Sequence, residues 1–269
     1  MIGSFPLCQI IKRAKEMKFI RISINEFKAL LNRVCESYYG HKYDFEDSAA
    51  IIQWLEIHDL NGIINFLRVI DATPKKIKLM PIIIERHKKR FVFDNQGHSL
   101  FHTGSIITDM TLAQCHQDGI CHSKINNTIQ PIVILHGLIK CSQFGYYAKA
   151  WWLETEKNLL HFASINPSEM YPNYSIVKIN NSILNNKSEL DLICSKDSNN
   201  SIESCLNIQP LLQKENVTQS ILPNEFKERF NEKIINGLYI EVTQYKRLSR
   251  MADQILVEAT EQSRLGAGE

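Results

Sequence analysis

The spacing of apolar residues predicts helices in the first part of the chain. Ser23-Ile24-Asn25-Glu26 has the form of a capping box, in which the serine caps a helix and the glutamate bonds back to it. Apolar side chains then recur at helical spacing and predict a helix from Ile24 to Tyr38. The same period continues from Phe45 to Leu55 and from Ile63 to Ile70. We therefore expect residues 18–74 to form a small helical bundle.

The pattern changes after Ile77 to short runs rich in Ile, Val, Phe and Tyr, which are typical of strands. Consecutive strands without helices between them favour antiparallel pairing. After Pro223 the helical pattern returns. The expected strands are residues 78–85, 90–94, 129–135, 146–154, 159–165 and 175–179, with Glu156-Lys157-Asn158 as a hairpin turn. We predict an α+β fold in a single globular domain over residues 18–269, with a helical part at 18–74, a mainly antiparallel β part at 75–222, and C-terminal helices and tail at 223–269.

The overall charge gives no reason to expect nucleic acid as a partner. The chain has 31 basic and 29 acidic residues, a net charge of +2, so it carries no strong positive field. Its apolar runs are too short to cross a bilayer, and a membrane is not expected either. Seven scattered cysteines without a secretory signal favour reduced thiols and a cytoplasmic location. We interpret Met17 as the native start of the protein.

Histidines and cysteines provide the candidate chemistry of the middle of the chain. Cys115-His116 and Cys121-His122 are soft ligands, but they lack the spacing of a zinc site, so no metal is expected. His98 and His102 flank a short segment with two glycines and are the candidate catalytic acid/base groups. The alternative is that both lie on the surface of a hairpin loop. GxGxxG, GxxxxGK[ST], GxSxG and HExxH motifs are absent, and no cofactor is assigned.

The C-terminal tail contains a second candidate site. Ser263 and Arg264 precede Gly266 and Gly268, and glycines allow backbone N–H groups to approach a ligand closely. Arginine offers a forked set of donors suited to carboxylate or phosphate. We hypothesise that these four residues bind an anionic small molecule. The alternative is an ordinary helix end followed by a flexible tail.

The tail is also where the sequence resembles a known family. Its ATExSRxGAG pattern, Trp54-Leu55-Glu56 with the following Leu60 and Gly62, and the capping box resemble elements of the bacterial family called domain of unknown function 3726. His58-Asp59-Leu60-Asn61-Gly62 is similar to the ADLxGxxSHG element of the malate/L-lactate dehydrogenase family. Here Ile63-Ile64-Asn65-Phe66 follows instead of the Ser-His-Gly that supplies that family's catalytic histidine. The resemblance therefore gives hydride transfer little weight.

Two functional hypotheses follow from these observations. In the first, the protein is an enzyme or ligand-binding protein that acts on an anionic metabolite. In the second, it is a non-catalytic accessory or assembly protein that binds a protein partner, with Trp151-Trp152 as the anchor. Alternation along a strand would instead bury one of these tryptophans and expose the other. A cleft that gathers arginine and histidine would favour the first hypothesis, and an exposed apolar patch would favour the second.

Overall fold

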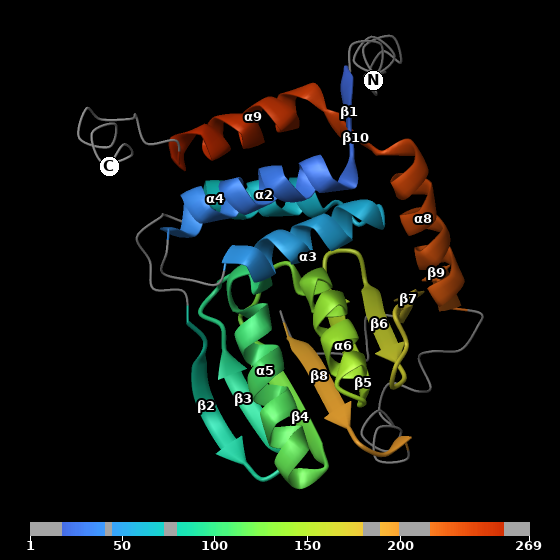
Figure 1. Ribbon diagram of the computed structural model, residues 1–269. Helices are drawn as coiled ribbons and strands as arrows, with labels where there is room; N and C mark the ends of the chain where they lie inside the picture. Colours follow the sequence, from blue (N-terminus) through green and yellow to red (C-terminus); the bar gives the residue numbers. More distant parts are fainter. Residues whose placement is uncertain (1–17, 41–44, 73–79, 180–188, 199–215, 256–269) are drawn as a thin grey trace, which may run out of the picture. The chain divides into compact units, whose positions relative to one another are not determined.

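The computed structural model describes residues 18–40, 45–72, 80–179, 189–198 and 216–255 (Figure 1). The residues before Met17 and the tail with Ser263, Arg264, Gly266 and Gly268 lie outside the described residues, so the predictions made for them stay predictions. The chain divides into two compact units. One combines the residues up to Gln53 with those from Asn231 onward, and the other runs from Trp54 to Phe230. The single domain expected over residues 18–269 also stays a prediction.

The first unit joins two segments from opposite ends of the chain. Strand β1 (Phe19–Ile22) pairs antiparallel with β10 (Leu238–Glu241), and α2 (Ile24–Tyr39) packs against α9 (Val242–Ala252). The predicted capping box of α2 is confirmed, because the Glu26 N–H donates to Ser23 Oγ at 3.2 Å and the Ser23 N–H donates to Glu26 Oε2 at 2.7 Å. The core is formed by apolar side chains from one face of α2. Two further helices, α3 (Phe45–Ile57) and α8 (Pro223–Asn236), contain residues of both units.

The second unit is built on an eight-stranded sheet. Its strand order is β2-β3-β4-β8-β5-β6-β7-β9. Only β3 and β4 pair in parallel; every other neighbouring pair among these strands is antiparallel. The strands are β2 (Ile82–His87), β3 (Arg90–Asp94), β4 (Ile120–Asn126), β5 (Tyr147–Glu154), β6 (Leu159–Ile165), β7 (Asn173–Lys178), β8 (Leu190–Ser195) and β9 (Val217–Ile221). Strand β8 enters late in the sequence and lies between β4 and β5.

Helices cover one face of this sheet. Helix α5 (Leu100–Asp118) connects β3 to β4 and packs on β4, and α6 (Ile134–Gln143) packs on β5 (Figure 1). The covered residues alternate along each strand: Cys121, Ser123 and Ile125 of β4 are buried, as are Ala148, Ala150 and Trp152 of β5. Helix α4 (Gly62–Ala72) meets the start of α5, where the rings of Phe66 and Phe101 have centroids 5.7 Å apart.

The predicted α+β class is confirmed, but one predicted strand is wrong. The segment 129–135 forms the 3₁₀ turn η2 (Pro131–Val133) and then enters α6. Its run of Ile, Val and Leu resembles a strand over a few residues, and only the longer helical period through Leu138 and Ile139 distinguishes the two. The hairpin loop considered for His98 and His102 is also wrong, because Ser99 caps α5 and His102 lies in its first turn. No helix in the described ranges is long and apolar enough to cross a membrane.

Candidate functional site

A cleft of about 590 Å³ lies in the second unit. Its walls come from the residues around the start of α4, from the loop before η2 and from the turn between β5 and β6. This turn is the predicted hairpin at Glu156-Lys157-Asn158, and Asn158 adopts a left-handed backbone with φ 53°. Side chains of β7 and β9 complete the lining with Tyr174, Ile176 and Gln219. The cleft therefore gathers residues from distant parts of the sequence.

The most organised group in the cleft is centred on His161. Its Nδ1 lies 2.7 Å from the Tyr174 hydroxyl, and its Nε2 lies 3.3 Å from Glu154 Oε2. The indole of Trp152 stacks on the imidazole with a centroid distance of 4.9 Å and an interplanar angle of 10°. His161 and Tyr174 are 8% and 3% exposed, so the imidazole is fixed by packing as well as by hydrogen bonds.

The protonation of this group follows from its partners. An ionised carboxylate only accepts hydrogen bonds, so Nε2 carries the proton that faces Glu154, and Tyr174 donates its hydroxyl proton to Nδ1. Burial lowers the pKa of His161, and Glu154 opposes this effect only in part. The net lowering of the pKa keeps the imidazole neutral. Burial also raises the pKa of Tyr174 and keeps the phenol protonated. For Glu154 the effect of burial is outweighed by hydrogen bonds from Lys157 and His161, so its pKa is lowered.

The ionic groups at the rim of the cleft are only partly paired. Lys157 Nζ lies 2.6 Å from Glu154 Oε1, and Lys124 Nζ lies 2.7 Å from Glu189 Oε2, so two carboxylates have a nearby cation. Arg68 of α4 and Glu156 of the β5–β6 turn also line the cleft. The side chains of these two residues make no hydrogen bond or ion pair within the described part of the chain. Among the described residues, one guanidinium and one carboxylate of the cleft are therefore left without an internal partner.

The catalytic candidates from the sequence lie elsewhere. His98 precedes α5 and His102 belongs to its first turn. Burial lowers the pKa of His98, and the charge of Asp94 partly opposes this effect. Burial, with a smaller contribution from His98, lowers the pKa of His102 to about 4. Neither residue is among those that line the cleft. Their catalytic role stays a prediction.

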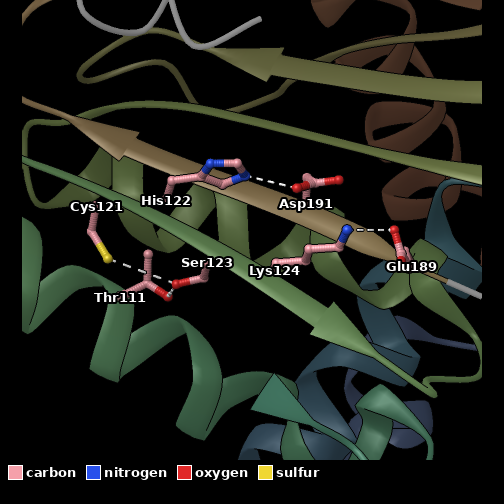
Figure 2. A network of polar contacts seen from close by, with 7 residues as sticks. All are labelled: Thr111, Cys121, His122, Ser123, Lys124, Glu189 and Asp191. Atoms are coloured by element: carbon pink, nitrogen blue, oxygen red, sulfur yellow. Dashed lines mark hydrogen bonds and ion pairs between the residues drawn. The ribbon is translucent and has the colours of Figure 1, made fainter. Parts of the chain in front are cut away.

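Strand β4 separates the two members of the second Cys-His pair, Cys121 and His122. Figure 2 shows that Cys121 and Ser123 point to the side of α5, where Ser123 bonds Thr111, while His122 points to the opposite face of the sheet. Alternation along a strand places neighbouring residues on opposite faces. Within the described ranges, no group of three or more His, Cys, Asp and Glu side chains is arranged to hold a metal ion.

His122 instead forms a polar pair on the other face of the sheet. Its Nε2 lies 2.7 Å from Asp191 Oδ1 of β8, and its ring centroid lies 5.9 Å from that of Trp151 (Figure 2). Trp151 is half-buried on this face, whereas Trp152 is buried at the cleft. Trp151 and Trp152 thus lie on opposite faces of β5, as the alternation of side chains along a strand predicts. They do not form a single surface that could anchor a protein partner.

Sequence reasoning missed His161, Tyr174, Glu154 and Arg68. A usable signal was present, because a hairpin turn at residues 156–158 sets the register that places Trp152 opposite His161. Tyr174 could not be found in this way, since its place beside His161 depends on the pairing of β7 with β6.

Comparisons with known proteins identify the fold. Neither a protein-family model nor a curated protein matches the chain. It is similar to the solved structure of malate dehydrogenase from Pyrococcus horikoshii OT3, with a TM-score of 0.61 and 10% identity over 89% of this chain and 97% of that one. It is also similar to sulfolactate dehydrogenase from Methanocaldococcus jannaschii, with a TM-score of 0.56 and 10% identity over 88% of this chain and 97% of that one. A third similar structure is Δ1-piperideine-2-carboxylate reductase from Pseudomonas syringae pvar. tomato, with a TM-score of 0.56 and 9% identity over 86% of this chain and 99% of that one.

These likenesses fit the similarity of the His58–Gly62 element to the malate/L-lactate dehydrogenase family, and at such low identity they show the fold alone. The resemblance to domain of unknown function 3726 stays a prediction. In the ADLxGxxSHG element the histidine follows the first glycine by four positions, which corresponds to Phe66 here. Phe66 is fully buried against Phe101, so this position has no titratable group. The chain thus shares the fold of these solved structures and has a core phenylalanine at the position that the resemblance gives to the histidine.

Proposed function

We propose that the protein binds a small organic acid in the cleft of the second unit and exchanges a proton with it through Tyr174, His161 and Glu154. The observation that carries the proposal is the joint presence, in one cleft, of the hydrogen-bonded group around His161 and of Arg68, which has no side-chain partner among the described residues. A guanidinium binds a carboxylate with two parallel hydrogen bonds. The named substrates of the three solved structures, which are all acids, support the same class of ligand.

The proton path follows from the hydrogen-bond directions. When a ligand group gives its proton to the Tyr174 oxygen, the phenolic proton passes to His161 Nδ1 and leaves an imidazolium beside the Glu154 carboxylate. Glu154 stabilises that cation and fixes the imidazole orientation. The reverse sequence returns a proton to the ligand. Hydride transfer is not part of the proposal, because Phe66 stands where the resemblance places the catalytic histidine.

Binding of the acid can be tested by isothermal titration calorimetry with lactate, malate and pyruvate, each compared with its neutral amide. We expect at least one acid to bind at least about tenfold more tightly than its amide. Arg68→Gln should remove this preference, because it removes the guanidinium and keeps a polar side chain. Arg90→Gln is the control, since Arg90 is also exposed but does not line the cleft. Equal affinity for acids and amides would contradict the proposal.

Proton exchange can be tested by incubating pyruvate with the protein in D₂O and following deuterium incorporation into its methyl group by NMR. The protein should speed up this incorporation, because a proton taken from the ligand and returned to it exchanges with solvent on the way. Tyr174→Phe should keep the preference for acids and abolish the acceleration, because it removes only the hydroxyl. An unchanged rate of incorporation in this variant would exclude the proposed path.

Exposed isoleucines favour a second candidate, a protein partner. Ile82, Ile83 and Ile84 of β2 are 51%, 40% and 59% exposed, and β2 is an edge strand of its sheet. Exposed apolar edge strands are sites of association. Ile83→Lys should then weaken any self-association seen in analytical ultracentrifugation, and its failure to do so would count against this candidate.

A further inference from the structure

We propose that Cys115 and Cys194 form a redox-active pair, which a hydroperoxide converts into a disulfide and a thiol reductant opens again. Both residues belong to the second unit, and neither is among the residues that line the cleft. The inference is therefore independent of the proposed function. It rests on the way in which the fold gathers cysteines that are far apart in the sequence.

Four buried cysteines meet between the helices and the sheet. Cys121 of β4 and Cys194 of β8 lie directly opposite each other in antiparallel strands, so their side chains are on the same face. Figure 2 shows that Cys121 points to the side of α5, the helix that contains Cys115. The Cys194 thiol is hydrogen-bonded to the thiols of Cys115 and of Cys141 in α6. All four are free thiols, and Cys194 is at their centre.

Cys115 is the member of the pair that ionises more readily. A hydrogen bond from the Cys194 thiol lowers the pKa of Cys115, burial opposes this effect, and the Lys196 ammonium lowers the pKa further. Lys196 is held at the end of α5, because its Nζ donates to the His116 carbonyl oxygen at 2.9 Å and its backbone N–H donates to that of Gly119 at 2.8 Å. Contacts with the neighbouring thiols, together with burial, raise the pKa of Cys194. Since the thiolate is the reactive form, Cys115 is the nucleophile.

The thiol of Cys121 is held in a different way. Thr111 donates its hydroxyl proton to the Ile107 carbonyl oxygen at 2.7 Å, so the Ser123 hydroxyl donates to Thr111 across 2.7 Å. The Ser123 oxygen then accepts from the Cys121 thiol at 3.8 Å (Figure 2). Burial raises the pKa of Cys121 to about 12. Cys121 therefore keeps its proton and does not attack the oxidant.

The oxidation proceeds in two balanced steps. The Cys115 thiolate attacks one oxygen of hydrogen peroxide, the O–O bond breaks, and the second oxygen takes a proton and leaves as water. The Cys194 sulfur then attacks the resulting sulfenic acid, whose hydroxyl leaves as water with the Cys194 proton, and the S–S bond forms. Two thiols are oxidised and one peroxide is reduced to two waters. The oxidant must be small, because both cysteines are buried, although His116 and Lys196 beside them are exposed.

Treatment of the full chain with hydrogen peroxide tests the proposal, followed by alkylation of the remaining thiols and peptide mass mapping without reduction. We expect the first disulfide to join Cys115 and Cys194, and dithiothreitol to restore both thiols. Cys35 of α2 is an internal control, because it is equally buried and burial raises its pKa. It should be oxidised at least about tenfold more slowly than Cys115. Equal rates, or a first disulfide between any other two cysteines, would overturn the proposal.

Substitutions separate the roles of the two sulfurs. Cys194→Ala should leave Cys115 as a sulfenic acid that dimedone traps, and Lys196→Gln should slow the oxidation of Cys115 several-fold. Lys178→Gln, which changes an exposed lysine of β7, should leave the rate unchanged. A disulfide formed by Cys115 at the parent's rate in Cys194→Ala would exclude Cys194 as the partner. Mapping of the parent chain decides the matter even if a variant does not fold.

Discussion

The imidazole of His161 lies almost parallel to the indole of Trp152, with their centroids 4.9 Å apart and an interplanar angle of 10°. The phenol of Tyr174 continues the stack, at 6.0 Å and 15° from the indole. Three rings from three adjacent strands thus form one wall of the cleft. Such stacking fixes the imidazole against rotation, and a fixed imidazole is what a directed proton path requires.

Trp152 should therefore contribute strongly to stability. Trp152→Leu leaves a cavity beneath His161 and should lower the free energy of unfolding by about 3 kcal/mol. Trp151→Leu is a matched control on the opposite face of the same strand, where the side chain is only half-buried, and should cost about 1 kcal/mol. Urea unfolding followed by circular dichroism measures both. Equal costs would show that the stack is not well packed.

Removal of the Tyr174 hydroxyl should also destabilise the protein. In Tyr174→Phe the buried His161 Nδ1 loses its donor, which should cost about 2 kcal/mol. Tyr239→Phe is the control, because Tyr239 is 62% exposed and should change stability by less than about 0.5 kcal/mol. A Tyr174→Phe variant as stable as the parent would show that another group satisfies the imidazole.

A buried histidine predicts loss of stability in acid. The His58 ring lies among Trp54, Tyr171 and Phe226, and burial, with a smaller effect of Arg229, lowers its pKa to about 4. The unfolded chain has a His58 pKa near 6.5 and takes up the proton first. The contribution of the neutral His58 to the free energy of unfolding is thus complete above pH 6.5. It falls by about 1.4 kcal/mol per pH unit as the pH drops towards 4, a loss of about 3 kcal/mol in total.

The contribution of His58 can be isolated by substitution. His58→Phe keeps an aromatic ring in the same surroundings and cannot be protonated, so its free energy of unfolding should fall less steeply between pH 6.5 and 4. The exposed His87→Phe should keep the slope of the parent. Urea titrations at several pH values measure these slopes. If His58→Phe and the parent have the same slope, His58 is not the group responsible.

Two glycines with left-handed backbones should differ in their tolerance of a side chain. A Cβ at Gly237, where φ is 73°, would lie 2.7 Å from the Ile22 carbonyl oxygen. At Gly145, where φ is 82°, a Cβ would meet nothing within 4 Å. Gly145→Ala should therefore cost only the backbone strain of about 1 kcal/mol, and Gly237→Ala about 3 kcal/mol or more. Thermal unfolding of the two variants measures both losses of stability. A larger loss in Gly145→Ala than in Gly237→Ala would contradict the prediction.

Local signals in the sequence predicted the elements that depend on neighbouring residues. The cap at Ser23 and the turn before Asn158 gave α2 and the β5–β6 hairpin, because both are decided within a few positions. Pairings between distant segments have no such signal. Phe19 pairs with Glu241, and nothing near either residue indicates the other.

The candidate site was missed for the same physical reason. His161 and Glu154 lie close in sequence, but Tyr174 and Arg68 come from different elements, and their meeting depends on the sheet register and on the place of α4. His98 and His102 were the catalytic candidates because they are close in sequence. In the structure their segment begins helix α5, because Ser99 caps the helix and the residues that follow are mainly buried.

The pairing of β1 with β10 has a consequence for synthesis on the ribosome. Residues 54–230 leave the exit tunnel as a continuous segment and can begin to fold as they emerge. Strand β1 and helix α2 are made first but must wait for β10 and α9, which follow more than two hundred residues later. During that interval the apolar face of α2 is without its late partner, so nascent chains arrested before residue 238 should engage chaperones more than released ones.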